Sequence, residues 1–199
     1  MTARGSATAG QVRGPAAGSA GSRSRGPDSR RPAGAGFLGR ARAIAAAVPD
    51  PELPMLTLAD LGILREVSAE GDRVVVAITP TYSGCPALRE MRGDLARRLA
   101  AAGYADVQVR TVLSPAWSTD WITAEGRRKL AAAGIAPPGP APRPAAGPVP
   151  LALTSRPGPA CPACGSPDTE RTAVFSATAC KDLHRCRACT EPFEHVKEI

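Results

Sequence analysis

The chain has 199 residues, a formal net charge of +7, and six cysteines but only two histidines. Residues 1–36 hold six arginines against one aspartate, and residues 136–160 add two arginines, whereas residues 37–135 and 161–199 are close to neutral. The basic charge therefore lies outside the presumptive folded parts, which argues against a nucleic-acid-binding fold. No stretch reaches the roughly 18–20 uncharged apolar residues that cross a bilayer, so a membrane-spanning protein is excluded as well.

Residues 1–36 are rich in Gly, Ser and Arg. Such a segment buries too little apolar surface to offset its ordering entropy, so we expect a disordered basic tail. An organelle transit peptide is the alternative for an Arg-rich, acid-poor N-terminus. With no secretory signal evident, we expect the protein in the cytoplasm, where paired cysteine spacings favour metal binding over disulfides.

Residues 37–135 predict a small α+β domain with the element order αββαβα. Its alanine-rich start predicts a helix over 38–48. The proline-rich segment that follows fits neither helix nor central strand, and it carries two carboxylates, Asp50 and Glu52. A helical turn is expected over 56–61.

The remaining elements of this domain follow from periodicity and turn signals. Apolar residues at helical spacing predict one long amphipathic helix, and β-branched or alternating residues predict the strands. In chain order we expect strands over 63–68 and 73–79 joined by a tight turn at 70–72, a helix over 86–102, a strand over 106–113 and a helix over 123–133 capped by Thr123.

Residues 136–160 contain nine prolines and predict an extended, semi-rigid linker,. The last segment, 161–199, is too short to build a core alone and needs a metal or a partner. Strands are expected within it over 169–177 and 193–199. The fold class is therefore α+β, with a Pro-rich linker and a small C-terminal module.

Two Cys-x-x-Cys pairs occupy this module: Cys161 with Cys164, and Cys186 with Cys189. Each pair can bend its backbone so that both thiolates reach one ion, and two pairs complete a tetrahedral site. The spacing predicts a zinc-ribbon-like module with structural zinc, although four thiolates also accommodate iron or an iron–sulfur cluster. Thioredoxin-like redox chemistry is the alternative, but it needs only one pair and a βαβ setting.

Cys180 is left over from these pairs. It is a spare structural thiol, a replacement ligand or part of an additional metal site, and the sequence leaves these options open. We expect His184 and His195 to be ordinary polar residues rather than ligands.

Cys85 lies in a polar turn between a predicted strand and a predicted helix. Pro86 is favoured at a first helical position, which would place Cys85 at the N-cap, where backbone N–H groups and the helix dipole favour a thiolate. Gly84 permits a tight turn, and Thr81 supplies a hydroxyl. The alternative is a small buried cysteine that fills a gap.

The chemistry available to Cys85 is limited by its neighbours in sequence. Residues 1–183 contain no histidine, so a Cys–His hydrolytic dyad is poorly supported,. A single thiolate with Asp50, Glu52 or Asp60 nearby better suits transient binding of iron or a cluster.

Trp117 and Trp121 lie four residues apart and could share one face of a helical turn. Either they pack in the local core or they form a partner-facing patch, since such aromatics anchor interfaces.

Several motifs together resemble known families. Three segments are similar to the α+β domain of SufT-type iron–sulfur assembly factors, namely 50–54 (DPELP), 60–63 (DLGI) and 81–86 (TYSGCP). Two further segments resemble the PaaD (also PaaJ) family of the ring-1,2-phenylacetyl-CoA epoxidase system, namely 115–121 (PAWSTDW) and 180–193 (CKDLHRCRACTEPF). The resemblance covers about residues 40–199, with the linker matching only as a spacer.

The resemblance implies a non-catalytic accessory role in phenylacetate catabolism. In such systems the oxygenase carries di-iron chemistry, a reductase carries flavin and a [2Fe–2S] cluster, and PaaD is inferred to help mature that metal centre. The expected partners are the other epoxidase components, especially the reductase, with no nucleic acid or membrane and with a homodimer as an option. The alternative is a structural subunit of the oxygenase complex.

The resemblance also assigns roles to residues. It implies iron or cluster transfer at Cys85 and an added role for Cys180, and it makes the four paired cysteines the C-terminal metal ligands. The supporting motif positions are Asp50, Glu52, Asp60, Thr81, Gly84 and Pro86.

Overall fold

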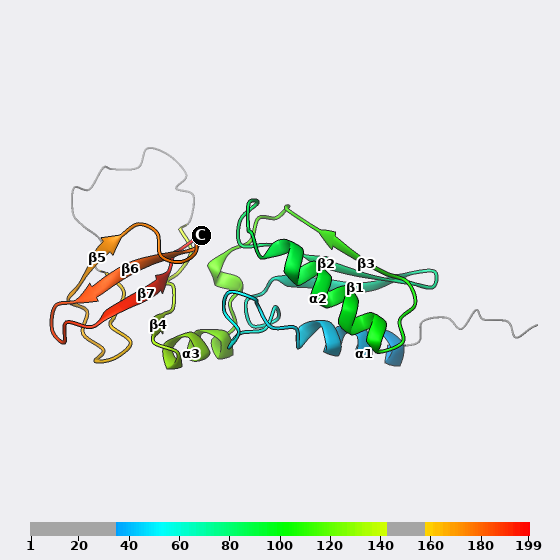
Figure 1. The fold of residues 1–199 in the computed structure, drawn as a ribbon, viewed down its shortest axis with the longest axis horizontal. Helices are drawn as coiled ribbons and strands as arrows, with labels where there is room; N and C mark the ends of the chain where they lie inside the picture. Colours follow the sequence, from blue (N-terminus) through cyan, green and yellow to red (C-terminus); the bar gives the residue numbers. More distant parts are fainter. Residues whose placement is uncertain (1–34, 143–157) are drawn as a thin grey trace, which may run out of the picture. The chain divides into compact units, whose positions relative to one another are not determined.

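The computed structural model describes residues 35–142 and 158–199 (Figure 1). The predicted basic tail and most of the predicted linker lie outside these residues. The described part is a mixed α+β structure with two sheets, which confirms the predicted fold class. None of its helices is long and apolar enough to span a membrane.

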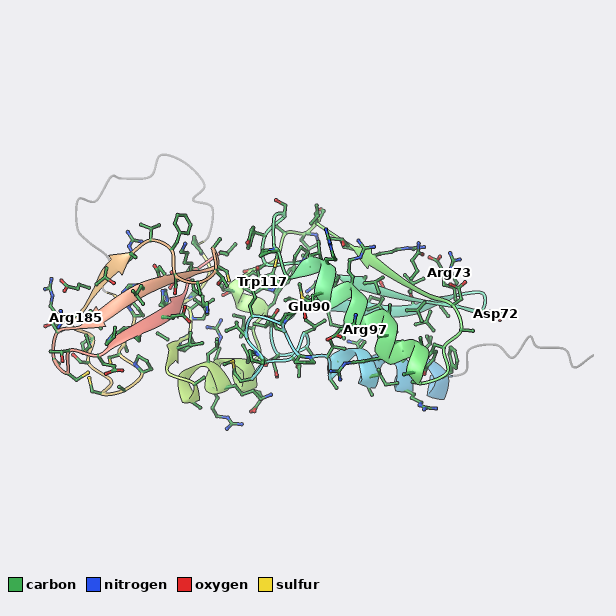
Figure 2. The ribbon with its side chains drawn as sticks, in the orientation of Figure 1. Asp72, Arg73, Glu90, Arg97, Trp117 and Arg185 are labelled. Atoms are coloured by element: carbon green, nitrogen blue, oxygen red, sulfur yellow. The ribbon has the colours of Figure 1, made fainter. Side chains whose placement is uncertain are left out.

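The first sheet contains β1 (Leu64–Glu70), β2 (Arg73–Ile78) and β3 (Val107–Thr111) in that order. β1 and β2 form an antiparallel hairpin, and β3 pairs with β2 in parallel. Figure 2 labels Asp72 and Arg73 where this hairpin turns. The three strands confirm the predicted elements to within a few residues at their ends.

Two helices, α1 (Ala35–Ala46) and α2 (Leu88–Ala101), contact each other and the sheet. Figure 1 shows them side by side along the strands. The apolar spacing expected for α2 proves to be its core face, where Met91, Leu95 and Leu99 are fully buried. β2 contributes three further fully buried side chains to the same core, namely Val74, Val76 and Ile78.

A short 3₁₀ helix, η1 (Thr119–Trp121), precedes α3 (Ala124–Ala132). The Thr123 hydroxyl accepts a hydrogen bond from the Gly126 N–H at 2.9 Å, which confirms Thr123 as the N-cap,. After α3 the chain forms β4 (Ile135–Ala136), a strand that the sequence did not predict.

The second sheet has the order β4-β7-β6-β5, with β5 (Thr169–Ala173), β6 (Lys181–Cys186) and β7 (Pro192–Val196). β5 and β7 are shorter than predicted, and β6 was not predicted. β4 pairs with β7 in parallel, so the assigned linker boundary at 136 falls within a strand. Val196 of β7 belongs to the main core.

The helical turn expected over 56–61 is present: the Leu61 N–H donates to the Thr57 carbonyl at 3.1 Å, and Gly62 ends the turn at φ +67°. A Cβ at Gly62 would lie 2.6 Å from the Trp121 Cβ, so both backbone conformation and space require glycine,. The helix expected over 86–102 begins at Leu88 with Ala87 as its N-cap, because Pro86 and Ala87 form a preceding turn.

Candidate metal and thiol sites

The four paired cysteines converge in the C-terminal module. The Cys161 and Cys189 sulfurs are 3.7 Å apart, the Cys164 and Cys186 sulfurs are 3.6 Å apart, and all four lie within 4.8 Å of one another. Sulfurs bound about 2.3 Å from a tetrahedral zinc ion lie roughly 3.8 Å apart. The four sulfurs are therefore arranged to hold one tetrahedral metal ion.

Both cysteine pairs rely on a left-handed residue directly after the second cysteine. Gly165 has φ +75° after the first pair, and Thr190 has φ +62° after the second. This conformation costs a β-branched residue such as Thr more than it costs glycine. The Cys189 N–H donates to the Cys186 sulfur at 3.4 Å, and this hydrogen bond is the largest of the effects that lower the pKa of Cys186 to about 7. The backbone thus favours the thiolate that a metal needs.

Cys180 lies outside this four-sulfur cluster. Its half-buried thiol contacts the Thr178 hydroxyl at 3.1 Å, just before β6 begins. Burial raises the pKa of Cys180, and the nearby Glu52 carboxylate raises it further. Cys180 is therefore not a member of the four-sulfur cluster, and the charge of Glu52 acts on its thiol.

Cys85 does not occupy the N-cap predicted for it, because α2 begins three residues later. Burial raises the pKa of the Cys85 thiol, and the N–H of Ala87 offsets only part of this effect. The sequence predicts a lowered pKa for Cys85, whereas the structure raises it, so this prediction is wrong. Desolvation of a half-buried sulfur outweighs the hydrogen bond near the helix start.

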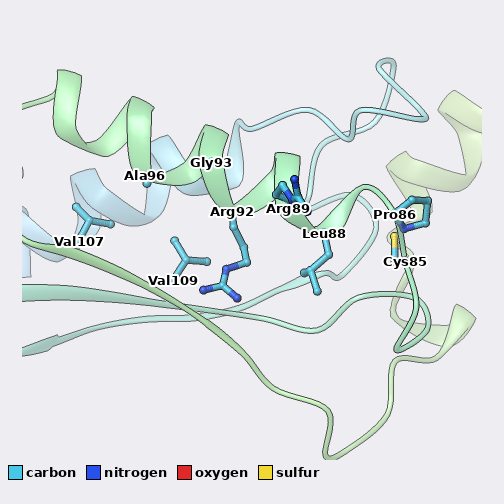
Figure 3. A pocket seen from close by; sticks show the side chains of 9 residues that line it. All are labelled: Cys85, Pro86, Leu88, Arg89, Arg92, Gly93, Ala96, Val107 and Val109. Carbon is cyan, nitrogen blue, oxygen red and sulfur yellow. The ribbon is translucent and has the colours of Figure 1, made fainter.

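Cys85 lines a pocket of about 720 Å³ between α2 and β3 (Figure 3). Figure 3 shows the thiol at one end of the pocket and Val107 at the other. Arg89 and Arg92 of α2 also line the pocket. The thiol is therefore accessible to a small ligand in a partly cationic setting.

Three residues distant in sequence from Cys85 raise the pKa of its thiol. Burial is the largest cause of the raised pKa, and the charges of Glu52, Asp50 and Cys180 raise it further. Asp50 is buried, and its Oδ1 accepts hydrogen bonds from the N–H groups of Glu52 (2.9 Å) and Leu53 (2.8 Å), which fixes the acidic segment. The structure thus brings Cys85, Cys180, Glu52 and Asp50 into one electrostatic neighbourhood.

The other predicted motif positions have local roles. The Asp60 carboxylate accepts from the Thr57 N–H (2.9 Å) and from the Lys129 ammonium (2.7 Å), and no described contact joins it to Cys85. Gly84 packs beside the Tyr82 ring, and half-buried Thr81 starts the turn. Pro86 lines the pocket directly after Cys85.

Comparisons with known proteins match two segments of this chain to known families. Residues 42–111 match the family described as iron–sulfur cluster assembly protein, and residues 145–197 match the PaaD zinc beta ribbon domain. An Escherichia coli (strain K12) protein, provisionally named as the D subunit of 1,2-phenylacetyl-CoA epoxidase, is 42% identical over 157 residues, covering 79% of this chain and 90% of its own length. The chain belongs to the PaaD family of phenylacetyl-CoA epoxidase subunits. This confirms the resemblance drawn from the sequence motifs.

Two solved structures are similar to part of this PaaD family member. A domain of unknown function (DUF59) from Bacillus anthracis is 26% identical, with a TM-score of 0.44 over 48% of this chain and 92% of that chain. A Mycobacterium tuberculosis protein associated with [Fe-S] complex assembly and repair is 27% identical, with a TM-score of 0.30 over 48% of this chain and 81% of that chain.

The Asp60–Lys129 pair predicts a pH-dependent stability. Burial raises the pKa of Asp60, but hydrogen bonds from Lys129 and Thr57 outweigh it, so the net pKa is lowered. A carboxyl with a depressed folded-state pKa stabilises the fold above its ordinary pKa and loses that effect as pH falls through the folded value. Replacing Lys129→Met should therefore cost roughly 1 kcal/mol at pH 7, as for a partly exposed ion pair, and progressively less towards pH 3.

Urea denaturation of wild type and Lys129→Met at pH 7 and pH 3 measures this difference. Arg128→Met is the matched control, because Arg128 pairs only with the exposed Glu125 of its own helix among the described residues. A cost that stays the same at both pH values would contradict the assignment.

Proposed function

We propose that this chain is a non-catalytic maturation factor of the epoxidase system, which handles iron or a nascent iron–sulfur cluster at Cys85. The observation that carries the proposal is the placement of Cys85 in an open pocket, with Glu52 and Cys180 near enough for their charges to raise its pKa. Thiolates and carboxylates are both iron ligands, and no histidine that could act as a general base for hydrolytic chemistry faces this thiol among its described neighbours,.

The raised pKa of Cys85 supports transient binding rather than permanent ligation. At neutral pH the resting thiol keeps its proton, so binding must displace that proton, which weakens the apparent affinity for metal,. Arg89 and Arg92 line the same pocket and would offset the negative charge of a thiolate-bound cluster,. A site that binds weakly and compensates charge suits iron or a cluster that is bound transiently and then transferred.

The ribbon would dock the client protein, with zinc at the four thiolates. Val174 and Phe175, directly after β5, are 53% and 65% exposed. Large exposed apolar side chains of this kind are typical of partner contacts. The iron–sulfur reductase of the epoxidase system is the proposed client. The cytoplasmic location and the homodimer stay predictions.

The experiment is complementation of a strain that lacks this protein. With Cys85→Ser, the cluster content of the reductase and the epoxidation rate should fall by about tenfold or more, because even outer-shell partners of metal ligands contribute 10–100-fold. Cluster content is measured by absorption and iron analysis of the isolated reductase. Leu88→Met is the matched control, since it keeps an apolar side chain on the same pocket wall.

The competing function is a structural subunit of the oxygenase complex. It predicts that Cys85→Ser co-purifies with the oxygenase and leaves both the cluster content and the rate at wild-type levels. That result would overturn the maturation proposal.

A further inference from the structure

Three polar side chains meet inside the second sheet, away from the four thiolates. Asp182 and His184 lie two residues apart on β6, so both point to one face of the sheet, and His195 of β7 is paired directly opposite Asp182,. All three are about 95% buried. The sheet register thus brings together two imidazoles and one carboxylate from two neighbouring strands.

The distances between their polar atoms suit a shared ion. Asp182 Oδ1 lies 3.1 Å from His184 Nε2 and 2.9 Å from His195 Nδ1, and one ligand atom from each residue falls within 4.8 Å of the other two. Adjacent ligand atoms bonded at about 2.1 Å to one ion lie roughly 2.9–3.4 Å apart. The two carboxylate-to-imidazole distances therefore fall in the range for ligands of one ion.

As a metal-free hydrogen-bond network the cluster is incomplete. His184 Nδ1 and His195 Nε2 are buried and have no hydrogen-bond partner among the described residues. Buried polar atoms are rarely left unpaired. Metal-bound histidines direct the opposite ring N–H to an acceptor, and Glu198 Oε1 lies 3.4 Å from His195 Nε2, where such an acceptor is needed,.

The negative charge of the buried Asp182 carboxylate also favours a bound cation. The buried Asp182 carboxylate has Arg171 as its nearest formal cation among the described residues, with Nη1 at 3.9 Å on a side chain that is 57% exposed. Buried carboxylates are normally paired closely or bound to a metal. A cavity of about 1180 Å³, lined by Asp182, His184, His195 and Glu198 among others, offers a route for an ion.

We propose that Asp182, His184 and His195 form a second metal site, for a divalent first-row transition ion such as Fe(II) or Zn(II). Two imidazole nitrogens and one carboxylate oxygen, with the remaining positions open to the cavity, are the donor set of facial-triad sites. The harder N and O donors separate this site chemically from the four thiolates. It is independent of the function proposed for Cys85.

Metal binding at this site requires a change of tautomer. A carboxylate can only accept hydrogen bonds, so in the metal-free cluster His184 Nε2–H and His195 Nδ1–H must be the donors to Asp182,. Ligation through the same nitrogens needs their lone pairs, so each proton must move to the opposite ring nitrogen, with no net proton released. ¹⁵N chemical shifts distinguish the two tautomers directly, and the chain contains only these two histidines.

The experiment uses the full, untagged chain labelled with ¹⁵N-histidine and purified with its four-thiolate site loaded. Zn(II) is titrated in, and bound metal is counted by elemental analysis after gel filtration. We expect one further equivalent per chain, with ligation shifts at His184 Nε2 and His195 Nδ1. A chain that takes up no second equivalent and keeps its metal-free histidine shifts overturns the proposal.

Variants separate ligation from structure. His195→Gln should lose the second equivalent but keep the first, and retention of the first shows that the module still folds. Arg171→Gln is the matched control: it removes the competing cation, so affinity for the second ion should stay the same or rise. A His195→Gln chain that still binds two equivalents would contradict the assignment, and the wild-type shifts decide the matter if that variant does not fold.

Discussion

Replacing Cys186→Ser is expected to release the ribbon metal and unfold the C-terminal module. Cys186 is fully buried, and the small cluster around it contains only Ala136, Cys161 and Phe193 among the described residues. So little apolar burial cannot hold three strands together, whereas a structural zinc ion contributes an apparent 10–16 kcal/mol or so. Loss of a ligand therefore removes most of the module's stability.

Elemental analysis should show the loss of about one metal ion per chain, and amide NMR spectra should lose dispersion for residues of β5 to β7. The first domain should keep its helices, although it loses the pairing of β4 with β7 and the core contact of Val196. Cys180→Ser is the matched control, because Cys180 lies outside the four-sulfur cluster. A Cys186→Ser protein with full metal content and a dispersed spectrum would contradict the prediction.

Replacing Trp117→Ala should destabilise the first domain by roughly 3–5 kcal/mol, the usual cost of truncating a buried large aromatic residue. The Trp117 side chain, labelled in Figure 2, is 4% exposed and belongs to the main core. Its Nε1–H donates to the Leu61 carbonyl at 2.8 Å, so truncation also leaves that buried acceptor unpaired,. Trp117→Phe should cost less, because the ring volume is partly kept.

Urea denaturation followed by circular dichroism gives these free energies without relying on tryptophan fluorescence. Trp121→Ala is the matched control. Its half-buried ring packs under the Arg65 guanidinium, 3.7 Å from the ring centroid, and this contact should contribute about 1 kcal/mol,. Equal costs for the two truncations would contradict the placement of Trp117 in the core and Trp121 at its edge.

The two tryptophans illustrate what a sequence pattern leaves open. Their spacing is compatible with core packing or with a partner-facing patch. The structure puts Trp117 in the core and leaves Trp121 half-buried against Gly62. No local signal distinguishes them, because burial depends on the chain segment around Leu61 that lies 56 residues earlier.

For Cys85, the local sequence pattern gives a wrong prediction of both helix position and pKa. The Gly-Cys-Pro pattern predicts an N-cap thiolate, but Pro86 and Ala87 form a turn before α2, and burial raises the pKa of Cys85. The effect of Cys180 on the pKa of Cys85 has no local sequence signal either, because the two residues lie far apart in the chain.

The sequence by itself determined the α+β class, the helices and strands of the first domain, and the four metal-binding cysteines. These follow from local periodicity, capping residues and the spacing of Cys-x-x-Cys pairs, all of which act over a few residues. Only the tertiary structure decided the pairing of β4 with β7, the neighbours of Cys85, and the cluster of Asp182, His184 and His195. Those arrangements depend on strand register and on contacts between distant segments, which local sequence signals do not specify.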